Sequence, residues 1–460
     1  MKIEQIYTNC LAQAAYYIES NGEAAVIDPL RDNDAYIKMA KDGGAKIMYV
    51  FETHFHADFV SGYMDLADKT GAKVVYGPDA KIEKGTILEA SDGELFSLGA
   101  VKIKILHTPG HTPESTTYLL IDADGKNHAI FTGDTLFIGD VGRPDLTVNK
   151  DISKEVLAGV LYDSLRSKIM PLEDHLIVYP GHGPGSACGK NMSKETFSTL
   201  GDQKKNNYAL QDISKEAFVK QVTTGILPPP QYFPGNVMLN MSGSKSIDKV
   251  VEHGLNGLSV EEVEKEIERG TVLLDTRHQE TFKNGFIPGS INIGLDGTFA
   301  VWAGTIIADI NMPIIILAED GREKESIVRL ARVGLDNSIG YIKGGINAWG
   351  ESGRKIDQIE SVASGNIGEQ IYRREAVILD VRKPQEFKAG HVKSAINVPL
   401  DVMNDHIHEL KKGKVYYLYC KGGYRSMMAS SILKANGFKD VLDITGGFDA
   451  ILKSAALEIV

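Results

Sequence analysis

Histidine and aspartate side chains follow four apolar runs in the first part of the chain. The four groups are Thr53-His54-Phe55-His56-Ala57-Asp58, Pro109-Gly110-His111-Thr112, Thr132-Gly133-Asp134 and Pro180-Gly181-His182-Gly183. Imidazole nitrogens and carboxylate oxygens bind zinc and iron alike. Because alternate residues at a strand end point the same way, we expect His54 and His56 to converge on one ion. One such pair is also compatible with surface loop histidines, but four groups in one domain indicate a metal site.

These side chains need a scaffold that brings strand ends together. Up to about residue 185, short β-rich runs alternate with turns and a few helical stretches, which indicates an α/β arrangement with loops after strands. A packed sheet presents polar side chains at its strand ends without burying them unpaired. Residues 191–225 are expected to be helical, and the Pro-rich segment 227–236 cannot continue a helix. We therefore expect a domain boundary near residues 240–255.

The order of His and Asp across residues 54–182 resembles that of the metallo-β-lactamase superfamily, in which the motif HxHxDH is followed by His, Asp and His. The resemblance covers the whole first domain and implies an αββα sandwich with the metal in a cleft between two sheets. One position departs from the pattern, since Phe59 stands where the superfamily usually has His. A phenyl ring is no metal ligand, so a site for one metal is favoured over a site for two.

The segment FTGDTLFIGDVGRPDL, residues 131–146, is similar to the persulfide dioxygenase branch of this superfamily, in which two His and one Asp hold a single Fe(II). The resemblance implies that His54, His111 and Asp134 bind one Fe(II) per chain, with zinc as the alternative metal. Such a set leaves about three positions open on iron, enough for a persulfide sulfur and dioxygen.

The resemblance also assigns roles to the polar residues around these ligands. His56, Asp58 and His182 would orient the ligands or hydrogen-bond metal-bound water. Arg143 would pair with a carboxylate or phosphate on the thiol-bearing half of the substrate, although it equally suits a structural role in the GRPD loop. Cys188 follows the His182 loop closely, so it is a candidate for sulfur relay or oxidation sensing, with a plain packed thiol as the alternative.

The second half of the chain contains an internal repeat. Residues 271–295 align with 376–400, and 340–349 with 442–451, which predicts two copies of one small parallel-sheet domain. In the second copy, Cys420 ends an apolar strand and a Gly-rich loop leads into a helix. Backbone N–H groups and the helix dipole favour a thiolate there, although an inert strand-end cysteine is the alternative.

This loop resembles the active loop of rhodanese domains, together with the segments LDVR, GHVKSAINVP and TGGFDA. The resemblance implies that Cys420 carries persulfide sulfur and that Arg425 closes the loop. In the first copy, Ala318, Glu319 or Asp320 stands where the cysteine should be, and none of them carries sulfur. We expect that copy to be catalytically silent and to serve as a spacer, an interface or a docking surface.

Length and composition limit the possible domain organisation, cellular location and binding partners of the protein. The predicted domains are 1–245 (metallo-β-lactamase fold), 255–355 (rhodanese-like, without the cysteine) and 362–460 (rhodanese). Hydrophobic residues at 43% and charged residues at 24% indicate a globular protein. No run approaches the ~20 apolar residues of a membrane span, and the N-terminus does not look like a signal peptide, so we expect a cytoplasmic protein. A net charge of -11 argues against nucleic-acid binding.

Together these patterns predict a persulfide dioxygenase and sulfurtransferase that acts in sulfide detoxification. Its substrates would be low-molecular-weight thiol persulfides and O2, and its products sulfite and/or thiosulfate. A zinc thioester hydrolase resembling glyoxalase II shares the His and Asp cluster, although Phe59 argues against the two metals such hydrolysis usually needs. A sulfur-relay or sensor protein with a non-catalytic metal domain is the alternative outside enzymes. The resemblance makes a homo-oligomer the expected assembly.

Overall fold

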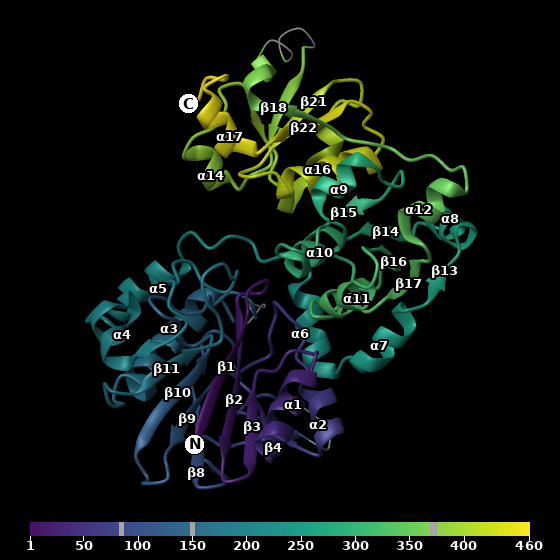
Figure 1. The fold of residues 1–460 in the computed structure, drawn as a ribbon. Coiled ribbons are helices and arrows are strands. Elements are labelled where there is room, and N and C mark those ends of the chain that lie inside the picture. Colours follow the sequence, from purple (N-terminus) through teal and green to yellow (C-terminus); the bar gives the residue numbers. More distant parts are fainter. Residues whose placement is uncertain (82–86, 148–151, 369–370, 372–374) are drawn as a thin grey trace. The chain divides into compact units, whose positions relative to one another are not determined.

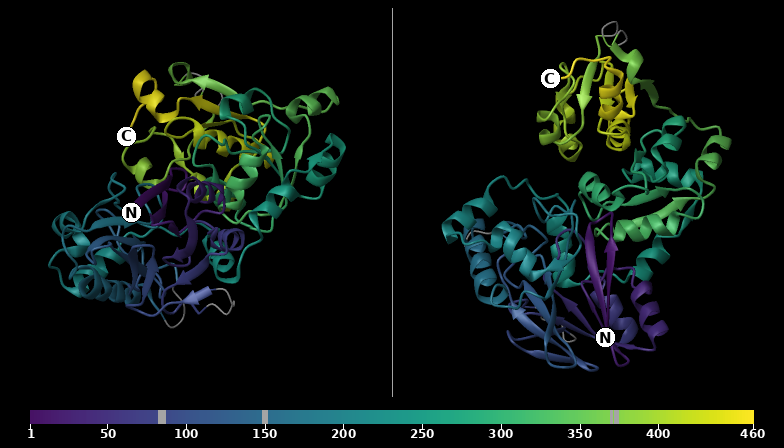
Figure 2. Two further views of the ribbon diagram at one scale, coloured as in Figure 1. Left: turned by 60° about the horizontal axis from the view of Figure 1, so that its bottom comes forward. Right: turned by 60° about the vertical axis from the view of Figure 1, so that its left-hand side comes forward.

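The computed structural model describes residues 1–81, 87–147, 152–368, 371 and 375–460 (Figure 1). The chain divides into two compact units. Unit 1 contains Met1–Ile247 and Ala331–Gly334, and unit 2 contains Asp248–Leu330 and Leu335–Val460. Both units mix helices and strands, as the ribbon in Figure 2 also shows from two further sides.

Unit 1 contains two six-stranded sheets. The first sheet has the order β1 (Lys2–Thr8), β2 (Gln13–Ser20), β3 (Glu23–Ile27), β4 (Lys46–Glu52), β5 (Lys73–Tyr76) and β6 (Ile87–Glu89). The second has the order β12 (Ser198–Thr199), β11 (Ile177–Pro180), β10 (Asn127–Gly133), β9 (Thr116–Ile121), β8 (Val101–His107) and β7 (Leu95–Leu98).

The two sheets pack face to face, with helices on their outer faces. Along β2, Tyr16 and Ile18 belong to the core between the sheets, whereas Ala15 and Tyr17 belong to the outer core. This period of two is the one that a strand buried on both faces requires. The helices of unit 1 are α1 (Asp34–Gly43), α2 (Tyr63–Thr70), α3 (Lys154–Ser164) with η1 (Leu165–Ile169), α4 (Leu200–Asn206), η2 (Tyr208–Leu210), α5 (Lys215–Thr223) and α6 (Phe233–Ser242). The predicted αββα sandwich is confirmed.

The strand directions bring the polar groups to one edge. Strands β8 and β10 both run antiparallel to β9, and β11 runs parallel to β10. The carboxyl ends of β8, β10 and β11 therefore share an edge of the second sheet, and each is followed by a His or Asp of the predicted metal site.

The end of unit 1 differs in detail from the sequence prediction. The expected helical segment 191–225 contains α4, η2 and α5, but residues 191–197 form no helix and β12 adds an edge strand. Helix α6 begins within the Pro-rich segment, because Pro234 lies in its first turn, where proline needs no hydrogen-bond partner.

Unit 2 contains two five-stranded parallel sheets, which confirms the predicted repeat of small α/β domains. The first has the order β13 (Gly257–Leu258), β17 (Ser338–Ile342), β16 (Ile314–Leu317), β14 (Val272–Asp275) and β15 (Ile291–Asn292). The second has the order β18 (Glu360–Ala363), β22 (Val441–Thr445), β21 (Tyr416–Tyr419), β19 (Val377–Asp380) and β20 (Ile396–Asn397).

The helices follow the same repeat. The first copy carries α8 (Val260–Glu268), α9 (Gln279–Asn284), α10 (Phe299–Ile307), α11 (Glu323–Ala331) and α12 (Gly345–Glu351), after the connecting helix α7 (Ile247–Gly254). The second carries η3 (Ser364–Asn366), α14 (Pro384–Lys388), η4 (Leu400–Val402), α15 (Met403–His406), η5 (Ile407–Glu409), α16 (Tyr424–Ala435) and α17 (Gly447–Ser454). Among the described residues, no helix has the length and apolar character needed to cross a membrane.

Candidate metal centre and sulfur-transfer site

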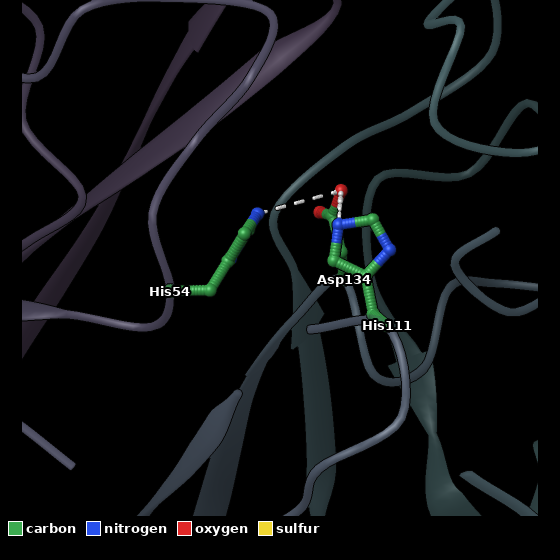
Figure 3. Close-up of side chains that lie close together, drawn as sticks. All are labelled: His54, His111 and Asp134. Carbon is green, nitrogen blue, oxygen red and sulfur yellow. Dashed lines mark ion pairs between the residues drawn. The ribbon is translucent and has the colours of Figure 1, made fainter. Parts of the chain in front are cut away.

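Three buried side chains from three loops converge in unit 1 (Figure 3). His54 follows β4, His111 follows β8 and Asp134 follows β10. Nε2 of His111 lies 3.5 Å from Oδ2 of Asp134, and Nε2 of His54 lies 3.9 Å from the same oxygen. Two imidazoles and one carboxylate at this spacing form a suitable donor set for a divalent metal.

The backbone fixes the tautomer of His111. Its Nδ1–H donates a hydrogen bond to the carbonyl oxygen of Arg143 over 2.7 Å. A carbonyl only accepts, so Nδ1 carries the proton and Nε2 presents a lone pair to the cluster. Gly142 permits this approach, because a Cβ atom there would lie 2.8 Å from Nδ1 and 2.1 Å from the carbonyl oxygen of Asp134.

A relay of hydrogen bonds fixes the tautomer of His54 in the same way. The hydroxyl of Thr53 donates to Oδ2 of Asp28 over 2.8 Å, and Oδ1 of Asp28 accepts the Thr53 backbone N–H. Since the hydroxyl proton is used by Asp28, the Thr53 oxygen accepts from Nδ1–H of His54 at 2.9 Å. Nε2 of His54 is left as the unprotonated nitrogen facing Asp134.

His182 orients Asp134, the third member of the cluster. Its Nδ1 lies 2.7 Å from Oδ1 of Asp134, and its Nε2 lies 2.7 Å from Oδ2 of Asp58. Oδ2 of Asp134 and Nε2 of His111 are buried and have no hydrogen-bond partner among the described residues. Buried polar atoms without partners are costly, so these two atoms fit the positions of metal ligands.

Charges in the cluster suit metal binding. Burial lowers the pKa of His54 and of His111, with a further contribution from neighbouring His56 to the first. Burial alone would raise the pKa of Asp134, but the three histidines around it lower the pKa far below its usual value. Burial opposes protonation of His182 too, yet Asp134 and Asp58 raise its pKa well above the usual range. Neutral imidazoles and an ionised carboxylate are the ligand forms that metals require.

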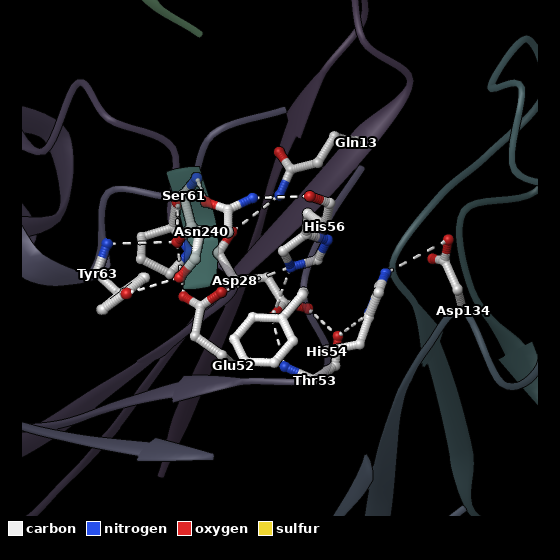
Figure 4. Close-up of polar contacts among 12 residues, drawn as sticks. Gln13, Asp28, Glu52, Thr53, His54, His56, Ser61, Tyr63, Asp134 and Asn240 are labelled. Carbon is white, nitrogen blue, oxygen red and sulfur yellow. Dashed lines mark hydrogen bonds and ion pairs between the residues drawn. The ribbon is translucent and has the colours of Figure 1, made fainter. Parts of the chain in front are cut away.

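His56 lies in a different cluster from His54 (Figure 4). Its Nε2 lies 3.1 Å from Asp28 and 3.6 Å from Glu52, although the rings of His54 and His56 are only 4.2 Å apart. The structure places His54 and His56 in two different groups of potential ligands, and β4 ends at Glu52, before a bend at Thr53 and His54. Convergence of both rings on one ion stays a prediction. The strand on which that prediction rests therefore ends before His54.

Phe59 closes the far side of this second cluster. Its side chain is fully buried, and its ring packs against the ring of His56 with centroids 4.2 Å apart. The amide of Asn240 donates to the carbonyl oxygens of His56 and Phe59 over 2.7 and 2.9 Å. Helix α6 thus holds the segment that carries His56, Asp58 and Phe59.

The guanidinium of Arg143 is occupied by contacts within the protein. Its Nε and Nη2 donate to the two carboxylate oxygens of Asp145 over 2.6 and 2.8 Å. Further donors reach the carbonyl oxygens of Ala187 and Leu227. These contacts favour the structural alternative for Arg143.

Cys188 lies beside the metal cluster. Its thiol belongs to a buried group with Asp58 and His182 whose ligand atoms lie within 4.8 Å of one another. Burial and, after it, the negative charges of Asp58 and Asp134 raise the pKa of this thiol well above its usual value. These surroundings favour the thiol form of Cys188, which is a weaker nucleophile than a thiolate.

Cys420 has the surroundings of a nucleophile. It follows β21 directly, and the backbone N–H of Gly423 donates to its Sγ over 3.1 Å. Helix α16 begins at Tyr424, so its positive end faces the loop. Arg425 lies in the first turn and pairs with both carboxylate oxygens of Glu386, at 2.6 and 2.8 Å.

In the first rhodanese-like copy, Ala318 stands at the position that Cys420 has in the second. Strand partners show this, since Asp275 pairs with Leu317 in one sheet as Asp380 pairs with Tyr419 in the other. Ala318 follows Leu317 as Cys420 follows Tyr419. A methyl side chain there carries no sulfur.

Comparisons with known proteins agree with this architecture. The family model of the metallo-β-lactamase superfamily matches residues 8–182, and the model of the rhodanese-like domain matches residues 259–352 and 367–454. The mitochondrial persulfide dioxygenase of Bos taurus is 30% identical over 48% of this chain and 78% of its own length. The chain belongs to the metallo-β-lactamase superfamily. Its metallo-β-lactamase domain is followed by two rhodanese-like domains.

Other similar proteins carry names of other members of the superfamily. The cytoplasmic hydroxyacylglutathione hydrolase of Arabidopsis thaliana is 34% identical over 40% of this chain and 67% of its own length. A crystal structure of a metallo-β-lactamase from Staphylococcus aureus subsp. aureus COL is 30% identical, with a TM-score of 0.65. It covers 74% of this chain and 98% of its own chain.

Sequence reasoning missed two residues that support the metallo-β-lactamase cluster. Asp28 holds Thr53 and, through it, His54, and it follows the apolar strand β3 as the predicted residues follow theirs. That shared pattern is a signal that could have found Asp28. Asn240 offers no such signal, because its contacts with the segment after β4 join residues far apart in the chain.

Proposed function

We propose that this protein is a persulfide dioxygenase and sulfurtransferase of sulfide detoxification. The observation that carries the proposal is the convergence of His54, His111 and Asp134, each with its other polar atom already bonded. The 30% identity to a persulfide dioxygenase supports it, and so does the Cys420 loop on the same chain. The net reaction at the metal domain would be RSSH + O2 + H2O → RSH + SO3²⁻ + 2H⁺.

The three converging residues would hold one Fe(II), with zinc as the alternative metal. Iron bound there would supply the redox chemistry that joins dioxygen to the terminal sulfur of a persulfide. Thr53 and the carbonyl of Arg143 keep Nε2 of both imidazoles unprotonated, and His182 keeps Asp134 oriented. His182 also holds Asp58, so these residues preorganise the ligands before a metal binds.

Cys420 would exchange sulfane sulfur with sulfite or with a thiol. The Gly423 N–H and the α16 N-terminus stabilise the thiolate and the persulfide anion that replaces it. Arg425 would hold the loop closed through Glu386. Roles for Arg143 in substrate binding and for Cys188 in sulfur relay remain secondary proposals, because the first has its donors occupied and the second is a buried thiol.

The test uses iron-loaded, full-length protein and glutathione persulfide as the thiol persulfide. We expect stoichiometric consumption of O2 and formation of sulfite, followed by thiosulfate when the rhodanese domain is active. A folded, iron-loaded protein that consumes no O2 would overturn the proposal. Metal analysis of the purified protein should give one iron per chain.

A zinc thioester hydrolase is the second candidate, because a hydroxyacylglutathione hydrolase is 34% identical to the same domain. Two zinc ions per chain, with hydrolysis of S-lactoylglutathione and no O2 consumption, would favour this function. Phe59 argues against it, since its buried ring offers no ligand for a second ion. A sulfur relay with an inert metal domain predicts that removing His54 leaves all sulfur chemistry unchanged.

Cellular context belongs to the same proposal. All three cysteines are free, and reducing compartments such as the cytoplasm keep thiols in this state. A homo-oligomer also stays a prediction. Cell fractionation and light scattering of the purified protein test these two points.

A further inference from the structure

A pocket of about 390 Å³ opens beside Cys420, and both rhodanese-like domains line it. Lys421, Tyr424 and Arg425 come from the domain that carries the cysteine. The facing wall comes from the domain without a catalytic cysteine, through Gln279, Thr298 and Trp302. The Cys-less domain therefore forms part of the pocket beside Cys420.

Direct contacts hold this wall against the Cys420 loop. The hydroxyl of Tyr424 donates to the carbonyl oxygen of Gly294 over 2.8 Å. A Cβ atom at Gly297 would lie 2.5 Å from the Tyr424 ring, so the absence of a side chain makes room for that ring. Because Tyr424 begins α16 directly after the Cys420 loop, this contact fixes the loop against the segment before α10.

Buried contacts extend the junction away from the pocket. The backbone N–H of Asn292 donates to the hydroxyl oxygen of Ser431 over 2.9 Å, and both residues are buried. The shared hydrophobic cluster of the two domains is Phe282, Phe286, Ile359 and Met427. This hydrogen bond and this hydrophobic cluster hold the two domains together, so the facing wall of the pocket stays in place in the absence of ligand.

The two walls differ in chemistry. The Cys420 side provides the Gly423 N–H, the helix N-terminus and the exposed ammonium group of Lys421, which suit an anionic sulfur group. The facing wall offers an amide, a hydroxyl and an indole ring, none of them charged. Thr298 is exposed, and Gln279 and Trp302 are partly exposed, so these side chains are available to a ligand.

The pocket has room for more than an inorganic anion. Pockets for organic small molecules begin at about 300 Å³, whereas an inorganic anion such as sulfite has only four heavy atoms. A pocket of about 390 Å³ leaves most of its space for an organic group attached to the reacting sulfur. Aromatic and hydrogen-bonding side chains are the usual means of orienting such a group.

We propose that the Cys-less rhodanese-like domain recognises the organic carrier of a thiol persulfide that exchanges sulfur with Cys420. This inference rests on the proposed sulfurtransferase function and names its substrate class. The Cys420 thiolate attacks the terminal sulfur of RSSH, the S–S bond of the donor breaks, and its electron pair leaves on RS⁻. The product is the Cys420 persulfide. Trp302 and Gln279 bind the R group of the donor and do not contact the reacting sulfur.

The experiment compares two sulfur donors under anaerobic conditions, so that the reaction with O2 does not contribute. Full-length protein receives glutathione persulfide or thiosulfate, and the Cys420 persulfide is quantified over time. We expect Trp302→Ala to lower the second-order rate constant of Cys420 persulfide formation about tenfold with glutathione persulfide, mainly through weaker binding, and less than about twofold with thiosulfate. Trp302→Phe should recover most of the loss, and Gln279→Ala should lower the rate constant with glutathione persulfide about threefold.

Gln358→Ala is the matched control, because Gln358 is an exposed glutamine of unit 2 outside the pocket. Equal losses with both donors would overturn the inference, since the wall would then only support the loop. Unchanged kinetics of Trp302→Ala and Gln279→Ala with both donors would overturn it too. A wild-type protein that accepts sulfur from neither donor would instead refute the sulfurtransferase function. If Trp302→Ala does not fold, Gln279→Ala and Thr298→Val apply the same test.

Discussion

The metal cluster and the Cys420 loop are built in different ways. His54, His111 and Asp134 come from three loops, and a fourth loop supplies His182, which orients Asp134. The Cys420 thiol instead lies in one short loop that leads into α16, and its Sγ accepts a hydrogen bond from within that loop. The candidate metal centre therefore depends on the packing of the whole sandwich, whereas the surroundings of the Cys420 thiol are set largely by local sequence.

The two rhodanese-like domains support this contrast. In both, an aspartate holds an arginine two residues later, and that arginine donates to a glycine carbonyl, over 2.9 Å from Arg277 to Gly285 and 2.8 Å from Arg382 to Gly390. The scaffold is thus retained in both copies. The two copies differ instead in the loop after the central strand, which begins with Cys420 in one copy and with Ala318 in the other.

The largest expected effect is the separation of the two activities. Asp134→Ala should lower O2 consumption about a thousandfold or more, because a metal ligand is lost, and Cys420→Ser should lower sulfur transfer from thiosulfate similarly. Each variant should leave the other activity within about twofold of wild type. O2 uptake and thiosulfate-to-cyanide transfer measure the two. Loss of O2 uptake in Cys420→Ser would contradict their independence.

A smaller effect should arise from Asp28, which touches no ligand directly. Asp28→Asn brings an amide N–H to the position that accepts the Thr53 hydroxyl, so Nδ1 of His54 loses its fixed protonation. We expect iron affinity to fall about 10–100-fold, measured by competition with a chromophoric chelator. Asp68→Asn, on the exposed face of α2, is the matched control. Equal affinity of Asp28→Asn and wild type would show that the relay does not orient His54.

The second rhodanese-like domain should show a pH-dependent stability through Asp443. Burial raises the pKa of Asp443 to about 6, and its carboxylate accepts a hydrogen bond from Ser426 over 2.6 Å. The folded state therefore holds this proton more tightly than the unfolded state, so stability falls as pH rises from about 4 to about 6. In the variant Asp443→Asn, the amide oxygen can accept the same hydrogen bond from Ser426, but the side chain does not ionise.

Asp443→Asn should accordingly remove this pH dependence. Relative to wild type, the variant should gain about 1–2 kcal/mol between pH 4.5 and pH 7, which differential scanning calorimetry detects as a rising difference in Tm. A difference in Tm that stays constant with pH would contradict the raised pKa of Asp443. The metal domain titrates equally in both proteins and cancels from the comparison.

The smallest effect is expected when a cysteine is added to the first rhodanese-like domain, because we expect almost no sulfurtransferase activity to return. Ala318→Cys in the Cys420→Ser background places a thiol at the equivalent strand end, but Glu319 and Asp320 follow it in place of the Gly-rich loop. Their charges disfavour a thiolate and repel anionic donors, so we expect less than about 1% of wild-type transfer. Recovery above that level, measured with thiosulfate, would show that the scaffold alone suffices.

The sequence determined the parts that depend on local pattern. Apolar runs followed by His or Asp predicted side chains that the structure brings together, and the repeat predicted the two small domains. The role of Cys420 as sulfur carrier stays a prediction. Such patterns can be read from sequence because strand ends, glycine-rich turns and helix starts are set by neighbouring residues. The absence of a cysteine after β16 was equally readable, although only strand pairing identified Ala318 as the equivalent residue.

Only the tertiary structure decided how the side chains of these parts are oriented. His56 turns to Asp28 and Glu52, Arg143 uses its donors on Asp145 and two carbonyls, and Trp302 lines the pocket of a cysteine in another domain. Each of these outcomes depends on partners that are distant in sequence or on the point at which a strand ends. A side chain's direction and the tautomer of an imidazole are set by the contacts around it, and those contacts exist only once the sheets have packed.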